Sequence, residues 1–172
     1  MWRLKDKADR VPIDTEYRSG DDGAVVWYYG TEAGAQGDPA SHPQPHHIFS
    51  AKVTGDLLES PQLMLSGNGL ADPSPLEFQS RLFLFLTTTP GRSIGVATGN
   101  PLRLQREWDG VSVPHAMVVG ESIWLWAQRV EAGRMVPVLA VSDDAGQTWS
   151  GWTRPLPMDG LAGCGNPVGA VF

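Results

Sequence analysis

One segment of the sequence contains residue types whose spacing defines their chemistry, and it reads Ser142-Asp143-Asp144-Ala145-Gly146-Gln147-Thr148-Trp149. The Asp144 carboxylate can accept hydrogen bonds from backbone N–H groups of a tight turn. Gly146 tolerates the positive φ that such a turn requires, and Trp149 can cover the turn from one side. We therefore expect five residues here to be structural rather than catalytic: Ser142, Asp144, Gly146, Thr148 and Trp149.

A second aspartate, Asp72, lies in the run Ala71-Asp72-Pro73-Ser74. Asp-Pro pairs commonly begin turns, and the carboxylate would then cap the turn. A carboxylate is also the group that acid–base catalysis requires, provided that a protonated acid faces it. The residues alone leave both interpretations open.

The histidines favour no metal site. His46 and His47 are adjacent, so their side chains would point apart on a strand. Together with the nearby Asp38 and His42 they match no defined zinc spacing. We expect neither a metal ion nor another cofactor.

The composition indicates one domain made of many short strands. The chain has 172 residues, of which 41% are hydrophobic and 19% charged, with 20 Gly and 14 Pro. A net charge of −6 disfavours nucleic acid and anionic membrane surfaces as partners. Cys164 is the only cysteine, so no intrachain disulfide can form, and we expect it to be a small buried side chain.

The N-terminal segment indicates no export signal. Residues 1–7 are charged and lack an apolar core region. The longest strongly apolar run, Leu82–Leu86, is far too short to span a bilayer. These features predict a soluble protein that is cytoplasmic or associated with a particle.

Helical periodicity is nearly absent, and short apolar runs end at Gly, Pro, Asn, Asp or Ser. The runs Leu82–Leu86 and Ile123–Trp126 are apolar on both faces, which is typical of strands covered on both sides. The region 31–45 reads as an exposed loop that is either functional or simple filler. The predicted strands are Ala24–Tyr29, His47–Val53, Gln62–Leu65, Leu82–Thr88, Ser93–Thr98, Ser122–Arg129 and Met135–Val141.

An internal repeat joins these strands into units. Ala51, Ala97 and Ala140 recur at intervals of 46 and 43 residues, within the range of propeller blades. Each unit has an aromatic-rich strand, a turn, and a strand ending in a small residue. We therefore predict an all-β, propeller-like fold of about three to four antiparallel blades, with Trp27, Phe83 and Trp124 on equivalent strands.

The same repeat divides the chain into three parts. Residues 1–20 are expected to be an N-terminal arm or closing strand, and residues 21–162 to hold the blades. Residues 163–172 are expected to begin a further blade or to close the fold. Because this length allows at most four blades, we expect association with a second copy or a larger partner through residues 163–172 and the first N-terminal strand.

Two resemblances follow from these motifs. Ser142–Trp149 resembles the Asp-box repeats of sialidases and other propeller proteins, which implies a structural turn on the rim away from the substrate. The order of Ala71–Ser74, Arg81–Leu86, Ser93–Thr98 and the segment beginning Val113-Pro114-His115 resembles five-bladed glycoside hydrolases that act on arabinosides, xylosides and fructosides. This second resemblance covers roughly residues 20 to 150.

The glycoside hydrolase resemblance implies a catalytic role for Asp72, as a base or as a pKa-tuning carboxylate. The family's acid is a Glu directly before Pro, whereas Val113 precedes Pro114 here, so the catalytic pair is incomplete. We expect His115, Trp126 and Arg81 to be ligand-binding candidates, although His115 could instead be a backbone-bonded histidine and Trp126 could instead fill space between blades. No spacing selects three of the chain's arginines for a sialidase-type carboxylate site.

These observations favour a non-catalytic, carbohydrate-binding or structural module related to glycoside hydrolases, and such a module could belong to a larger assembly such as a virus particle. The alternative is an active glycosidase that oligomerisation completes. Neither nucleic acid nor a membrane is expected as a partner.

Overall fold

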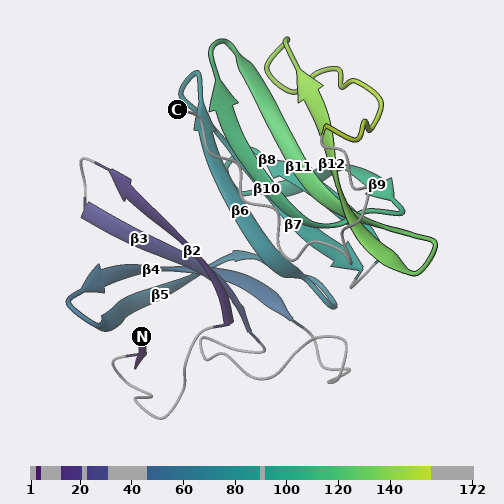
Figure 1. The fold of residues 1–172 in the computed structure, drawn as a ribbon. Helices are drawn as coiled ribbons and strands as arrows, with labels where there is room; N and C mark the ends of the chain where they lie inside the picture. The colour runs from purple at the N-terminus through teal and green to yellow at the C-terminus, as the bar shows by residue number, and fades with distance from the viewer. Residues whose placement is uncertain (1–2, 5–12, 21–22, 31–45, 90–91, 156–172) are drawn as a thin grey trace.

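The computed structural model describes residues 3–4, 13–20, 23–30, 46–89 and 92–155, which form twelve strands in three sheets (Figure 1). The expected loop at 31–45 and the expected closing segment at 163–172 lie outside the described residues. The prediction of an all-β, propeller-like fold is confirmed. No helix in the described ranges has the length and apolar character needed to cross a membrane.

Each sheet is built from strands that follow one another along the chain. The first sheet has the order β1-β5-β4-β3-β2, the second β6-β7-β8-β9 and the third β10-β11-β12. Neighbouring strands are antiparallel except β1 and β5, which are parallel. The strands are β1 (Arg3–Leu4), β2 (Ile13–Gly20), β3 (Gly23–Gly30), β4 (His47–Thr54), β5 (Leu57–Leu65), β6 (Ala71–Phe78), β7 (Arg81–Thr89), β8 (Ser93–Thr98), β9 (Arg103–Asp109), β10 (Ser112–Val119), β11 (Ser122–Glu131) and β12 (Arg134–Ser142).

The predicted repeat appears as a repeated register. Ala51, Ala97 and Ala140 lie on β4, β8 and β12, where each pairs with a residue of the preceding strand. Those partners are Val26, Leu84 and Leu125. Trp27, Phe83 and Trp124 lie on β3, β7 and β11, the second antiparallel strand of each unit, as predicted.

The same register corrects which aromatic residues of the three units are equivalent. Counting from the alanine partners, Trp27 corresponds to Phe85 and Trp126 rather than to Phe83 and Trp124. This correspondence places the three aromatic side chains on the same face of their respective sheets.

Two apolar layers hold the sheets together. Trp27, Tyr29 and Ile48 of the first sheet pack against Leu84 and Leu86 of the second. The opposite face of the second sheet packs against the third, and this layer includes Phe83, Phe85, Ile94, Ile123, Leu125 and Val138. Strand β7 is therefore buried on both faces, as its apolar run predicted.

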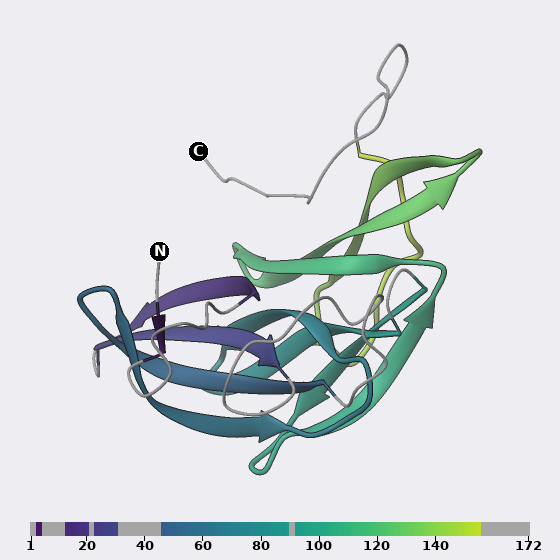
Figure 2. The same ribbon diagram turned by 90° about the horizontal axis from the view of Figure 1, so that it is seen from below.

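Strand β11 is covered less completely than its sequence predicted. Ile123 and Leu125 are fully buried against the second sheet, whereas Trp124 and Trp126 face away from it and are half-buried. Further along this outer face, Val130 and Met135 are exposed. The described sheets do not close into a ring (Figures 1 and 2).

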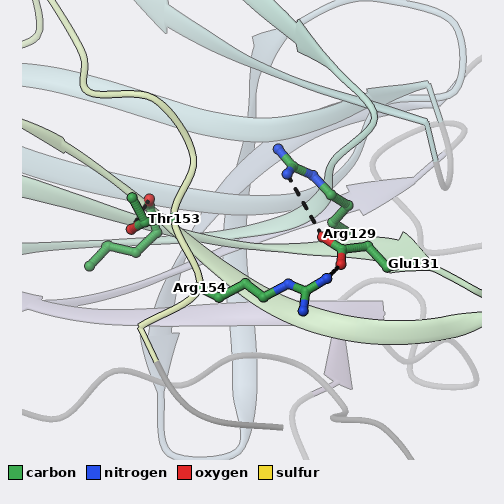
Figure 3. Close-up of polar contacts among 5 residues, drawn as sticks. Arg129, Glu131, Thr153 and Arg154 are labelled. Atoms are coloured by element: carbon green, nitrogen blue, oxygen red, sulfur yellow. Dashed lines mark hydrogen bonds and ion pairs between the residues drawn. The ribbon is translucent and has the colours of Figure 1, made fainter.

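The chain returns to the third sheet after β12. Leu139 and Thr153 exchange two backbone hydrogen bonds of 2.9 and 3.0 Å, in antiparallel geometry. Arg154, the residue after Thr153, forms an ion pair with Glu131. Arg129 forms a second ion pair with Glu131 at 3.8 Å (Figure 3). Thr153 thus occupies the position of a fourth strand beside β12.

Candidate functional site

The first strand of each unit contains a bulge at the same place. The register shifts between Ile13 and Glu16 in β2, between Ala71 and Ser74 in β6, and between Ser112 and His115 in β10. The three strands are neighbours in space, since β6 contacts both β2 and β10. The bulged pairs are Asp14-Thr15, Asp72-Pro73 and Val113-Pro114.

The bulges place two side chains on unusual backbone. Asp72 has φ 47° and Val113 has φ 50°, both in the left-handed region. This region is strongly disfavoured for a β-branched residue such as valine. Bulges of this kind redirect a side chain out of the regular alternation and cluster near functional sites.

A single hydroxyl connects the second and third bulges. Thr87 of β7 donates a hydrogen bond from Oγ1 to Asp72 Oδ2 at 2.6 Å. The same Oγ1 accepts a hydrogen bond of 3.1 Å from the Val113 backbone N–H. Asp72 is therefore a partly buried, oriented carboxylate within a strand, and it is not the cap of a turn.

A second polar link joins the same two strands deeper in the structure. The Ala116 backbone N–H donates to Ser74 Oγ at 3.0 Å, and Ser74 is 2% exposed. Because Ser74 lies two residues beyond Asp72, this link fixes the spacing of β6 and β10 without contacting the carboxylate.

The other predicted ligand-binding residues lie in two different places. His115 follows the third bulge and pairs across strands with Trp126, on the outer face of the third sheet. The Trp126 indole Nε1 is buried and has no hydrogen-bond partner among the residues that the structure describes. Arg81 pairs with Phe78 at the far end of β6 and β7, six residues from Thr87 and thus about 20 Å from Asp72.

Arg81 lies beside two hollows at that far end. A hollow of about 790 Å³ has Arg81 with Gln62, Glu77 and Asn100 in its wall. A smaller one of about 250 Å³ includes Arg81, Arg106, Gly146 and Trp149. Arg129 and Arg154 converge on Glu131 instead, so these arginines do not gather around one point.

The Ser142–Trp149 segment forms a closely hydrogen-bonded turn at this far end. Asp144 accepts bonds from the Thr148 backbone N–H at 2.8 Å and from the Thr148 hydroxyl at 2.6 Å. Ser142 Oγ donates to Asp144 and accepts from the Gly146 N–H. The Trp149 indole donates to the Gly146 carbonyl and its ring packs edge-on against Phe85.

Hydrogen bonds from the Thr148 side chain, and then from its backbone, lower the pKa of Asp144 to about 2. The carboxylate is therefore ionised, and it accepts hydrogen bonds from residues of the turn itself. Its surroundings favour a structural role.

No group of three or more His, Cys, Asp or Glu side chains within the described ranges is arranged to hold a metal ion. Sequence reasoning missed Thr87, which makes the central contact of the site. Thr87 directly follows the apolar run Leu82–Leu86, and a single hydroxyl in a strand has no spacing pattern that would mark it in the sequence.

The comparisons with known proteins concern the fold. No protein-family model and no curated protein matches this sequence. Zg3597, a family 117 glycoside hydrolase of the marine bacterium Zobellia galactanivorans, has a similar structure, with a TM-score of 0.62 at 12% identity over 83% of this chain. An α-L-arabinofuranosidase from Lactobacillus brevis has a TM-score of 0.55 at 11% identity over 81% of this chain.

This chain spans about half the length of each neighbour, 56% of the first and 53% of the second. At these identities the similarity establishes the fold, which is that of propeller-type glycoside hydrolases.

Proposed function

We propose that this chain is a carbohydrate-binding module on a glycoside hydrolase fold and that it does not hydrolyse its ligand. The observation that carries this proposal is the pair of equivalent bulges at Asp72 and Val113. One presents an oriented carboxylate, and the other presents an aliphatic side chain.

The chemistry of glycosidic bond cleavage supports the distinction. Cleavage requires one carboxyl group to protonate the leaving oxygen and a second to act as base or nucleophile. Valine can neither donate nor accept a proton. A carboxylate at Asp72 can still accept hydrogen bonds from sugar hydroxyls, which is sufficient for binding.

Binding is tested by titrating the purified chain with methyl arabinosides, xylosides and fructosides and following its NMR spectrum. We expect saturable shifts for at least one sugar, and at least a tenfold weaker affinity in Asp72→Asn. The matched control is Glu77→Gln, on the same strand but in the wall of the hollow at the far end, which should bind normally. Absence of saturable binding to every sugar would refute the proposal.

One observation favours the alternative of an active glycosidase. Asp14 occupies the first bulge, in the same register position as Asp72 and Val113, so a second carboxyl-bearing position exists. Turnover of aryl glycosides that disappears in both Asp14→Asn and Asp72→Asn would establish the enzyme. We expect no turnover.

We further propose that the chain associates with a second copy through the outer face of the third sheet. An apolar strip on that face consists of Trp124, Trp126, Val130 and Met135. Trp126 is the equivalent of Trp27 and Phe85, which are buried between sheets. Packing two such faces together extends the stacking of sheets already present.

A further inference from the structure

We propose that Thr87 is the positioning residue of the Asp72 site and that it ties the Asp72 carboxylate to the bulge of the next sheet. The inference rests on the proposed function only where ligand binding is its readout. Thr87 is only 1% exposed, so it is shielded from solvent and acts through Asp72.

The direction of both hydrogen bonds is fixed by the groups involved. A hydroxyl has one proton and can accept through its lone pairs. The Val113 N–H can only donate, so the Thr87 oxygen must accept from it. The hydroxyl proton is then available for Asp72, and the bond runs from Thr87 Oγ1 to Asp72 Oδ2.

Loss of either hydrogen bond would reduce the stability of the fold, because a polar group would lose its partner. The Val113 N–H belongs to a bulge and has left the regular ladder between β10 and β11. Without Thr87, this N–H would lose its described acceptor and the Asp72 carboxylate would lose an oriented donor. One buried side chain therefore fixes the two bulges relative to each other.

The repeat gives independent support. Thr87 pairs with Ala71, the residue immediately before its bulge. The equivalent partners are Tyr29 opposite Ile13 and Gln128 opposite Ser112. All three side chains, Tyr29, Thr87 and Gln128, are at most 3% exposed and all have a hydrogen-bonding group. A buried side chain with a hydrogen-bonding group thus recurs opposite the residue that precedes each bulge, where an apolar residue would suffice for packing alone.

The test compares Thr87→Val, which keeps the shape, with Thr87→Ser, which keeps the hydroxyl. Hydrogen exchange measured by NMR reports the Val113 amide, and the carboxyl carbon resonance of Asp72 at pH 7 reports the carboxylate. In Thr87→Val we expect at least tenfold faster exchange at Val113 and a displaced Asp72 resonance. Thr87→Ser should restore both.

Ser74→Ala is the matched control, because it removes a hydroxyl acceptor between the same two strands. It should accelerate exchange at Ala116 and leave Val113 and the Asp72 resonance unchanged. Equal effects of Thr87→Val and Ser74→Ala on Val113 would show general loosening and overturn the proposal. Unchanged Val113 exchange in Thr87→Val would also overturn it.

Sugar binding is measured on the same variants. We expect Thr87→Val to weaken binding of the methyl glycoside selected above by at least fivefold, and Thr87→Ser to retain it. If the unmodified chain binds no sugar while both NMR signatures appear, the proposed function fails and the positioning role stands.

Discussion

Replacing Gly146 by alanine tests how tightly the Ser142–Trp149 turn packs against the second sheet. Gly146 has φ +84°, and a Cβ at this position would lie 3.0 Å from Cε1 of Phe83. The Phe83 ring is 3% exposed and stacks on Phe85, so it has little room to retreat. The substitution therefore combines backbone strain with overpacking.

Gly133→Ala separates these two effects. Gly133 lies in the turn between β11 and β12 at φ +75°, and a Cβ there would meet no atom within 4 Å. Left-handed backbone costs an alanine about 1–2 kcal/mol, partly offset because alanine restricts the unfolded chain. We expect Gly133→Ala to lower the free energy of unfolding by about 1 kcal/mol.

Gly146→Ala should cost more than this control. Overpacking a well-packed core typically costs about 1–3 kcal/mol, so the total loss should be about 2–4 kcal/mol. The double variant Gly146→Ala with Phe83→Leu should lose less than the sum of its single losses, since the smaller side chain removes the contact.

The measurement is equilibrium unfolding in denaturant. Free energies of unfolding are compared between variants that share the same m-value, the slope against denaturant concentration. Equal losses of unfolding free energy for Gly146→Ala and Gly133→Ala would show that no overpacking occurs at Gly146. Strict additivity in the double variant would refute the contact with Phe83 specifically.

Three further outcomes are expected. The pKa of Asp144 falls from 3.8 to about 2 in the fold, so its contribution to stability is complete above pH 3.8 and disappears as the pH falls toward 2; melting curves should show Asp144→Asn losing its deficit against the unmodified chain over this range. Phe85→Ala should lower the free energy of unfolding by about 3–5 kcal/mol in denaturant, because this side chain is fully buried, and a loss below about 1 kcal/mol would contradict its place in the core. Sedimentation at micromolar concentration should show self-association that Met135→Glu abolishes, and a monomer at every concentration would exclude the proposed contact.

The sequence predicted the central strands of each sheet better than the outer ones. Strands β3, β7, β8, β11 and β12 are apolar runs bounded by turn residues, and their periodicity identified them. Strands β2 and β9 were missed because they are rich in polar residues, as edge strands commonly are; β9 is almost entirely exposed.

The strands that form the candidate site were hidden for a different reason. Strands β6 and β10 contain Pro73, Pro75 and Pro114, which weigh against a strand. Each lies at the edge of its sheet, where a missing N–H is tolerated, and each includes a bulge. A motif resemblance could locate Asp72, but the hydrogen bonds that orient it depend on contacts between β6, β7 and β10, which no local pattern encodes.

The bulges also show how equivalent positions of this fold can present side chains of different chemistry. The backbone path at Asp72 and Val113 is nearly the same, although one residue is charged and the other aliphatic. The bulge is held by neighbouring pairing and by the acceptor that Thr87 provides, and these interactions involve backbone atoms at position 113. The side chain at position 113 takes part in neither interaction, so equivalent bulges can present a carboxylate in one sheet and an aliphatic side chain in the next with the same strand pairing.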